Sequence, residues 1–414
     1  MNSAFKIATN SPNQSRSAEI LFTNTEYSLS EKIIINQKAA SYVTVHVVQK
    51  GGLSDVLVDK ELNPESIISM KIIGELDAED FLTIQNMINL KNLDLEEVNL
   101  TELPTKAFYK MKTIENLILP HTLTIINDSE FYQNSLKSII ISSNVETIGE
   151  YAFYECPLKS INIPASVKAI NKAAFMNCSS LATITFSKGS MLTKICGGKG
   201  FLSHGEKYYY GAFANCTALT SIEIPANVEI IEEAAFKNCT ALTTVTFENN
   251  SSLKTICGAT YDYSYYGGAF SDCISLISIE IPASVETIEA AAFKGCTGLQ
   301  EAYIGDGVTE IAAKAFAECT ALKTVVIGKS IQRIGDQAFN TRSSWDQMTL
   351  EKITVLFDDI ASGSFPVLES GSRGVFPKPG GWDLVSYKIY VPKGTKAEYQ
   401  KNWSDYSSLI VEMQ

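Results

Sequence analysis

Cysteine is the residue of this chain whose spacing most strongly suggests chemistry. Seven of the nine cysteines occupy one position of a repeated phrase: Cys156, Cys178, Cys216, Cys239, Cys273, Cys296 and Cys319. If the phrase stacks as parallel strands, neighbouring cysteines lie about 4.8 Å apart, which is within the range of Cα separations in disulfides. Rigid parallel stacking disfavours the crossed geometry of a disulfide, so we expect free, buried thiols, with disulfide bonds as the alternative. The spacing matches neither a Cys-x-x-Cys pair nor a zinc motif.

Histidine is scarce, which limits the catalytic chemistry available. His46, His121 and His204 are the only three, and none forms a Ser-His-Asp or Cys-His arrangement. A thiol site that pairs Cys196 or Cys257 with His204 is the alternative to a solvated loop histidine. No Gly-rich phosphate loop follows a predicted strand. We therefore expect a protein that is not an enzyme, with no catalytic residues, no metal site and no cofactor.

Tyrosine is concentrated in two insertions, each of which begins with Ile-Cys-Gly. The first contains His204 and Glu206 and ends with Tyr208, Tyr209 and Tyr210, and the second contains Tyr261, Asp262, Tyr263, Tyr265 and Tyr266. Tyrosine supplies contact area at low entropic cost, while Gly and Ser let a loop adapt to its partner. We predict that these side chains bind a partner. The alternative is that the tyrosines pack on each other and seal a thin region of the core.

Phenylalanine marks the repeat that positions these residues. Eight rings follow Ala or Gly-Ala in the same local phrase: Phe153, Phe175, Phe213, Phe236, Phe270, Phe293, Phe316 and Phe339. The last four are 23 residues apart, and such a fixed period is typical of a solenoid. In one repeat, Ile222 and Ile224 alternate with polar residues and Pro225 ends the strand. No repeat can bury its apolar side alone, so the repeats must stack.

The full phrase Leu-x-x-Ile-x-Ile-Pro-x-x-Val-x-x-Ile-x-x-x-Ala-Phe-x-x-Cys resembles the BspA-like leucine-rich repeat class of bacterial surface proteins. The resemblance extends over about residues 90–355. It implies an α/β leucine-rich-repeat solenoid, built as a right-handed horseshoe of about ten rungs with a parallel sheet on the concave face. It also implies a location at the cell surface or outside the cell and adhesion to protein or glycoprotein partners.

The segments outside the repeats are expected to cap them. The predicted division is a mobile N-terminal segment at 1–40, an N-terminal cap at 41–89, the solenoid at 90–355, and an irregular segment with a C-terminal cap at 356–414. In the first cap, 42–47 alternates as a strand, 53–62 is compatible with a helix, and 77–89 has helical spacing with Phe81, Ile84 and Ile88 on one side. In the second, a strand at 387–392 precedes a helix at 395–403.

The residues that flank the central apolar position of each strand are predicted to form the exposed concave face, because side chains alternate across a strand. Short hydroxyls dominate there, with acids and one tyrosine toward the second half: Glu223, Glu280, Glu301 and Tyr303. We predict that these four contribute to partner binding. The alternative is that hydroxyl residues are simply favourable on a solvent-facing strand.

Composition narrows the classes of partner. The formal net charge is −12, which argues against neutralisation of nucleic-acid phosphates by a basic surface. No stretch reaches the roughly 18 apolar residues of a membrane helix, and the sequence as it stands shows no signal peptide. The predicted function is that of a non-enzymatic surface or secreted binding protein for protein or glycoprotein ligands, possible glycan ligands included. The alternatives are a carbohydrate-binding module and a structural spacer in a surface assembly.

Overall fold

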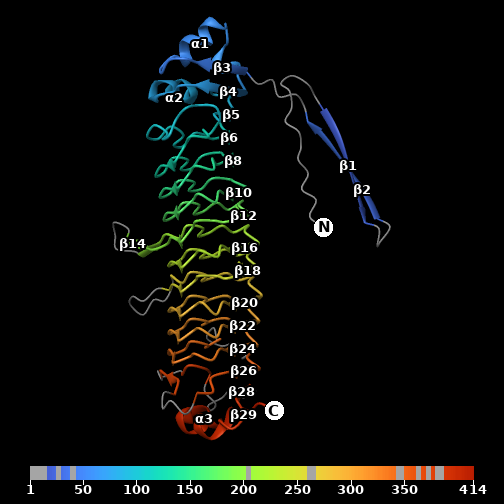
Figure 1. Ribbon diagram of the computed structural model, residues 1–414, viewed down its shortest axis with the longest axis vertical. Helices are drawn as coiled ribbons and strands as arrows, with labels where there is room; N and C mark the ends of the chain where they lie inside the picture. Colours follow the sequence, from blue (N-terminus) through green and yellow to red (C-terminus); the bar gives the residue numbers. More distant parts are fainter. Residues whose placement is uncertain are drawn as a thin grey trace.

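The computed structural model describes residues 16–24, 29–37, 43–201, 207–258, 267–341, 349–359, 365–369, 374–377 and 387–414. From Val43 onward the chain winds into a straight column of stacked coils (Figure 1). Within the segment 1–40, β1 (Arg16–Asn24) and β2 (Leu29–Gln37) form an antiparallel hairpin. The mobility of that segment stays a prediction.

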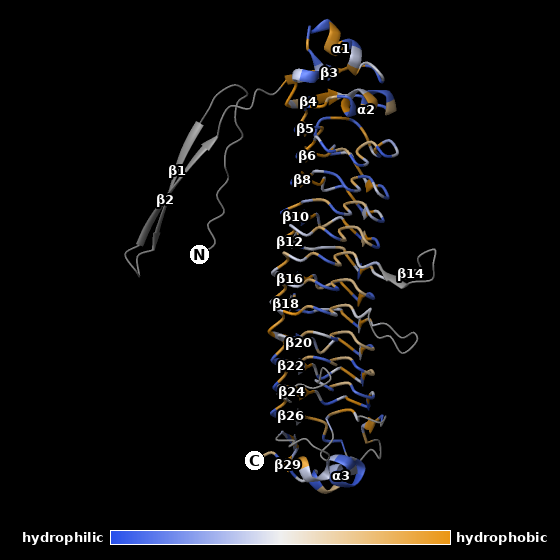
Figure 2. Ribbon diagram, turned by 180° about the vertical axis from the view of Figure 1, so that it is seen from behind, coloured by the Kyte–Doolittle hydropathy of each residue, from blue (hydrophilic) through white to orange (hydrophobic). Residues whose placement is uncertain are grey.

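The longer strand of each coil joins a parallel sheet, the main sheet, which runs along the column in two sections. The first section contains β3 (Val43–Val47), β4 (Ser69–Gly74), β5 (Asn92–Asp94), β6 (Asn116–Ile118) and β8 (Ser138–Ile140). The second contains β10 (Ser160–Ile163), β12 (Thr183–Phe186), β16 (Ser221–Ile224), β18 (Thr244–Phe247), β20 (Ser278–Ile281), β22 (Glu301–Ile304), β24 (Thr324–Ile327), β26 (Lys352–Val355), β28 (Lys388–Val391) and β29 (Ile410–Glu412). Most apolar residues of these strands point inward, with Ile140 (58% exposed) and Tyr303 (40% exposed) as exceptions. Apolar and polar positions alternate within the coils along the column (Figure 2).

A second parallel sheet of two-residue strands lies on another side of each coil. Its members are β7 (Ile125–Ile126), β9 (Thr147–Ile148), β11 (Ala169–Ile170), β13 (Lys194–Ile195), β17 (Ile230–Ile231), β19 (Thr255–Ile256), β21 (Thr287–Ile288), β23 (Glu310–Ile311), β25 (Arg333–Ile334) and β27 (Val367–Leu368). The second residue of these strands is buried in nearly every coil. Each coil therefore encloses its apolar residues between two sheets and a corner.

The phenylalanines close that corner as a continuous ladder of stacked rings. From Phe108 to Phe376, consecutive ring centroids lie 4.9–5.5 Å apart. The eight predicted rings are all members, and Phe108, Phe131 and Phe376 extend the ladder at its two ends. The stacked-ring prediction is confirmed.

The cysteine column lies next to the ladder and is tied to it by hydrogen bonds. Each of the seven thiols donates to the main-chain carbonyl of the ladder phenylalanine in the preceding coil, over 2.8–3.3 Å. All seven are free and buried. Each Sγ–H group points at a carbonyl oxygen and not at the sulfur of the next coil. This orientation is a geometric reason why the column contains thiols and not disulfides.

The overall shape and the number of rungs differ from the expectation. The coils stack straight rather than as a horseshoe (Figures 1 and 2), and there are about 14 of them rather than ten. Curvature arises where elements on the outside of a coil, such as helices about 10–12 Å wide, are wider than the strand spacing of about 4.8 Å. Here the far side carries two-residue strands and rings at nearly the strand spacing, so the stack does not bend. The additional rungs arise because β3 and β4 at one end, and β26 and β28 at the other, join the main sheet.

The two ends carry the helices. The N-terminal end has α1 (Leu53–Asp59), the 3-10 helix η1 (Pro64–Ser66) and α2 (Ala78–Gln85), and the C-terminal end has α3 (Lys396–Asn402) and the 3-10 helix η3 (Ser404–Leu409). Buried Asp80 of α2 links this helix to the start of α1, because its carboxylate accepts from the main-chain N–H groups of Gly51 and Leu53 at 2.8 Å. The predicted strands and helices of both ends are confirmed. Ile88 is the exception: α2 ends at Gln85, and Ile88 is 61% exposed.

Candidate functional site

The exposed side of the main sheet carries the predicted acids and tyrosine. Glu223, Glu280, Glu301 and Tyr303 are all exposed, as their strand positions predicted. Tyr303 is 40% exposed, and its hydroxyl donates to a carboxylate oxygen of Glu301 over 3.0 Å. This hydrogen bond raises the pKa of Tyr303 above its ordinary value, so the phenol stays protonated. The pair offers an oriented ring next to a negative charge.

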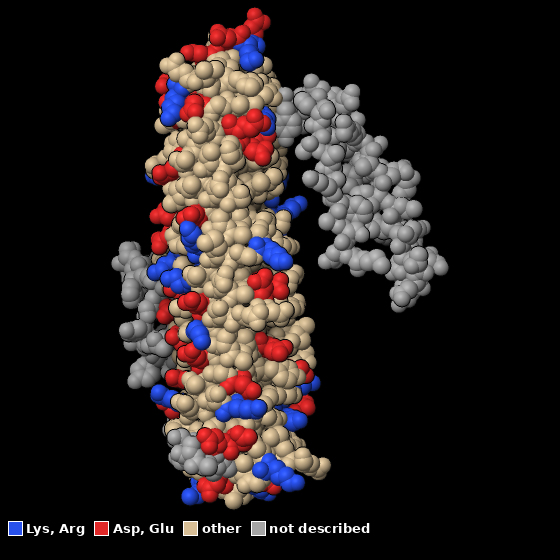
Figure 3. Space-filling model, in the orientation of Figure 1, with Lys and Arg blue, Asp and Glu red and all other residues tan. Residues whose placement is uncertain are grey.

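The residues paired in register with Tyr303 lie on the neighbouring strands of the main sheet. Glu280 pairs with Tyr303, Tyr303 with Val326, Val326 with Thr354, and Thr354 with Tyr390. An acid, two aromatic rings, one aliphatic side chain and the buried Thr354 therefore form a row of five residues on neighbouring strands. In the orientation of Figure 3, acidic and basic side chains are interspersed between large uncharged areas, and the described residues on the face drawn there form no basic stripe.

The main sheet is interrupted before three strands that are followed by proline, whereas β28, which is followed by Pro392, keeps three paired residues with β26. β10, β16 and β20 are followed by Pro164, Pro225 and Pro282. Proline has no N–H to donate to the neighbouring strand. Accordingly, β8 and β10 belong to different sheet sections, and β12–β16 and β18–β20 are paired at one residue each, Thr183 with Ser221 and Thr244 with Ser278. Beyond that residue the two strands of each pair diverge.

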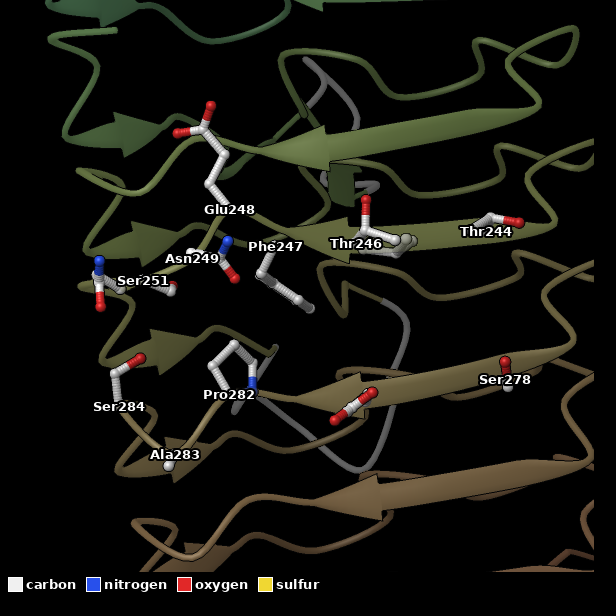
Figure 4. A pocket seen from close by; sticks show the side chains of 13 residues that line it. Thr244, Thr246, Phe247, Glu248, Asn249, Ser251, Ser278, Pro282, Ala283 and Ser284 are labelled. Atoms are coloured by element: carbon white, nitrogen blue, oxygen red, sulfur yellow. The ribbon is translucent and has the colours of Figure 1, made fainter. Parts of the chain in front are cut away.

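A cavity of about 610 Å³ lies in the gap between β18 and β20. Phe247 ends β18, and Figure 4 shows its side chain in the gap between the two strands. The corresponding residue in most coils is a buried isoleucine, such as Ile224 or Ile281, whereas the larger Phe247 is only half-buried. The rest of the lining is mainly hydroxyl, amide and carboxyl: Thr246, Asn249, Ser251, Ser278, Glu280 and Ser284.

The tyrosine insertions begin on a different side of the column. β14 (Lys199–Phe201) pairs with β15 (Lys207–Tyr209) and projects away from the main sheet (Figures 1 and 2). Tyr210 is half-buried against Ala173, Met176 and Ala214, and its ring centroid lies 5.8 Å from that of Tyr151. For Tyr210, the structure therefore shows the packing alternative, in which a tyrosine of the insertion packs against the column. The site thus divides into two regions, because β14 is not adjacent to Tyr303.

Several predicted binding residues lie outside the described part of the chain. They are His204, Tyr261, Asp262, Tyr263, Tyr265 and Tyr266, together with the side chains of Tyr208 and Tyr209. Their role in binding stays a prediction.

Glycine at the roots of the insertions permits close packing of the main chain. Gly268 occupies the position held by Ala234 and Ala291 in regular coils. A Cβ on Gly268 would overlap the carbonyl group of Ala291 in the next coil.

We therefore expect Gly268→Ala to lower the free energy of unfolding by about 1–3 kcal/mol, the usual cost of overpacking, as measured by urea denaturation. Ala291→Gly, the reverse change at the matched position, is the control and should cost less. A Gly268→Ala protein as stable as the wild type would show that the chain can return from its insertion by another path.

The remaining cysteines are poorly suited to act as nucleophiles. Burial raises the pKa of Cys196 to about 11 and that of Cys257 to about 12, whereas a reactive cysteine needs a lowered value. Within the described ranges, no three His, Cys, Asp or Glu side chains are grouped as metal ligands.

A family model described as the BspA type leucine rich repeat region matches six copies of the repeat, over residues 81–198, 206–264 and 264–366. These ranges cover more than half of the sequence. The chain belongs to this BspA-type leucine-rich repeat family. Comparison with curated proteins gives no match.

Solved structures similar to this BspA-type chain come from several bacteria. A leucine-rich cell surface protein from Faecalibacterium prausnitzii has 21% identity over 88% of this chain and 100% of its own, with a TM-score of 0.38. A leucine-rich repeat protein from Bacteroides ovatus has 18% identity over 97% and 100%, with a TM-score of 0.42. The pneumococcal vaccine antigen PcpA has 20% identity over 77% and 85%, with a TM-score of 0.34.

Sequence reasoning missed the cavity of this BspA-type solenoid. Two signals were present: Phe247 in place of the usual isoleucine, and a turn before Ile256 that is longer than the regular one. Neither signal reveals a cavity by itself, because the gap forms only where such a coil precedes a strand that ends in proline. Among the helices of the described ranges, none has the length and hydropathy needed to cross a bilayer.

Proposed function

We propose that this protein is a non-catalytic binding protein that engages a protein or glycoprotein through the exposed side of the main sheet. The observation that carries the proposal is the Tyr303–Glu301 pair, an exposed aromatic ring held by a carboxylate on a rigid strand. Tyrosine is enriched among the few residues that dominate binding energy at interfaces. A stack of paired strands changes shape little, so little conformational entropy is lost on binding.

The row from Glu280 to Tyr390 gives this surface its extent. Five adjacent strands contribute to it, and the nearby Lys352 ammonium lies 5.2 Å from the centroid of the Tyr390 ring. Tyrosine rings with a carboxylate at one end and an ammonium at the other favour a partner with both charged and apolar groups. We further propose that the protein works at the cell surface or in secreted form, as its family resemblance implies, with the tyrosine insertions as a separate contact.

The proposal is tested by measuring binding of the purified chain to arrays of extracellular proteins and glycoproteins. For a partner found with the wild type, we expect Tyr303→Ala to weaken binding ~30-fold, which corresponds to the loss of about 2 kcal/mol at an interface hot spot. Glu301→Ala should weaken it less, because the ring remains.

Tyr109→Ala is the matched control. Tyr109 is half-buried and stacks on Tyr132 at the corner of the column, away from the main sheet, so its removal should leave the affinity unchanged. Equal affinities of the Tyr303→Ala and wild-type proteins for every partner would remove the main sheet from the proposed function. Loss of binding in Tyr209→Ala or Tyr263→Ala alone would transfer the role to the insertions.

A further inference from the structure

We infer that the cavity between β18 and β20 is a binding site for a neutral saccharide unit. The cavity shares Glu280 with the row proposed to bind a protein but does not include Glu301 or Tyr303, so the two proposals can fail independently. Its volume of about 610 Å³ lies within the range of roughly 300–1,000 Å³ found for small-molecule sites.

The origin of the cavity lies in two coils that do not match. The turn after β18 contains Glu248, Asn249 and Asn250 and includes a residue at positive φ, Asn250 at 60°. The next coil has the short turn Pro282-Ala283-Ser284. A long turn above a short one, with a proline that cannot donate to β18, leaves space between the two main chains.

A second gap lies between β12 and β16, where a long turn is again followed by a strand that ends in proline. A side-chain hydrogen bond spans this second gap. There, Asn227 donates from its amide nitrogen to the main-chain carbonyl of Ser190 over 2.7 Å. Ser284 stands at the position of Asn227 and has a shorter side chain. Its hydroxyl oxygen is buried and has no hydrogen-bond partner among the described residues.

The unpartnered hydroxyl is not a general property of this position. Ser166, at the same place in an earlier coil, donates to the carbonyl of Val145 over 2.7 Å. A buried hydroxyl without a partner costs free energy, and a ligand hydroxyl in the cavity would supply the missing hydrogen bond. The Ser284 oxygen is buried in this structure, so its side chain would have to rotate toward the cavity to meet a polar occupant.

The remaining lining defines the class of that occupant. The half-buried Phe247 offers a ring against which the C–H face of a sugar can lie, while Glu280, Thr246 and Asn249 are exposed and can exchange hydrogen bonds with its hydroxyl groups. Glu248 and Glu280 are the charged residues of the lining, and no basic residue is among them. The Glu248 carboxylate accepts from the main-chain N–H of Ala226 over 2.9 Å and points away from the gap (Figure 4). The exposed Glu280 carboxylate repels an anionic ligand, so the sugar should be neutral.

The test uses methyl glycosides of galactose, mannose, glucose and N-acetylglucosamine as neutral probes and glucuronate as the anionic probe, measured by saturation-transfer NMR and calorimetry on the full chain. We expect at least one neutral probe to bind with one saturable site at millimolar or better affinity, and glucuronate not to bind. Phe247→Ala should weaken binding at least tenfold. Phe186→Ala, the same change in the second gap, should leave it unchanged.

The Ser284→Asn variant distinguishes loss of sugar binding from loss of folding. The longer amide should bridge the gap as Asn227 does, so that binding falls at least tenfold while the melting temperature stays the same or rises. Ser166→Asn is its control and should leave binding intact. The inference is overturned if no neutral probe binds, if glucuronate binds as well as the neutral sugars, or if the probe binds equally to the wild-type, Phe247→Ala and Ser284→Asn proteins. None of these results bears on protein binding at Tyr303.

Discussion

Replacing Phe236 with alanine is expected to lower the free energy of unfolding by about 3–5 kcal/mol, the usual cost of truncating a buried aromatic side chain. The ring is fully buried, and its centroid lies 5.4 Å from that of Phe213 and 5.1 Å from that of Phe270. The cavity left behind cannot close, because the strand spacing holds the two neighbouring rings apart.

Phe236 lies in the middle of the stack of coils, which increases the effect of its truncation on unfolding. In a solenoid each coil contacts only its neighbours. A destabilised coil in the middle therefore lets the two halves of the column unfold less cooperatively. Circular dichroism during heating should show a lower midpoint and a broader transition for Phe236→Ala. Phe186→Ala is the control, since its half-buried ring loses less contact. An unchanged melting curve for Phe236→Ala would mean that the ring ladder does not hold the coils together.

Replacing Glu130 with glutamine is expected to stabilise the protein above pH 7 and to have little effect below pH 4.5. Glu130 is fully buried where regular coils have alanine, and one carboxylate oxygen accepts from the main-chain N–H of Phe108 over 3.1 Å while the other has no partner among the described residues. Burial raises the pKa of this carboxyl from 4.5 to about 7.

The direction of the pH dependence follows from linkage. Below pH 4.5 the carboxyl is protonated in both the folded and the unfolded chain; between pH 4.5 and about 7 the unfolded chain alone has lost the proton. The stability contributed by protonated Glu130 is therefore fully present below the unfolded pKa and is lost as the pH rises through the folded pKa. The whole loss amounts to roughly 3 kcal/mol at 1.36 kcal/mol per pKa unit.

Glutamine keeps an oxygen for Phe108 and cannot ionise. The difference in melting temperature between Glu130→Gln and the wild type should thus grow as the pH is raised from 4.5 to 8. Glu150→Gln makes the same change at an exposed position and serves as the control. A difference that stays constant across this pH range would show that Glu130 does not change its protonation within the folded state.

The repeat was predictable because its signals are local. Alternation around Ile222, the proline after Ile224 and the phenylalanine at a fixed distance each report on one coil, and the structure confirms the strands and the corner that they predict. The ladder members Phe131 and Phe376 were not recognised because they follow Glu130 and Val375 rather than alanine.

The remaining features depend on relations between coils. The straight shape follows from equal spacing on all sides of the stack, and the cavity beside Phe247 follows from unequal turns in successive coils, neither of which is encoded within one repeat. The predicted acids of the main sheet were found because strand alternation alone decides their exposure. The tyrosines of the insertions had no repeat to position them.

The ring ladder also ends in a way that bears on how copies of the chain can assemble. At one end the ring of Phe81 meets Phe108 edge-on, at 5.6 Å and 89°, and at the other Tyr406 meets Phe376 at 5.5 Å and 83°. If the last ring exposed its face, a ring of another copy could stack on it and extend the ladder. Open-ended contacts of that kind generate filaments. The edge-on terminal rings present no such template at either end of the ladder.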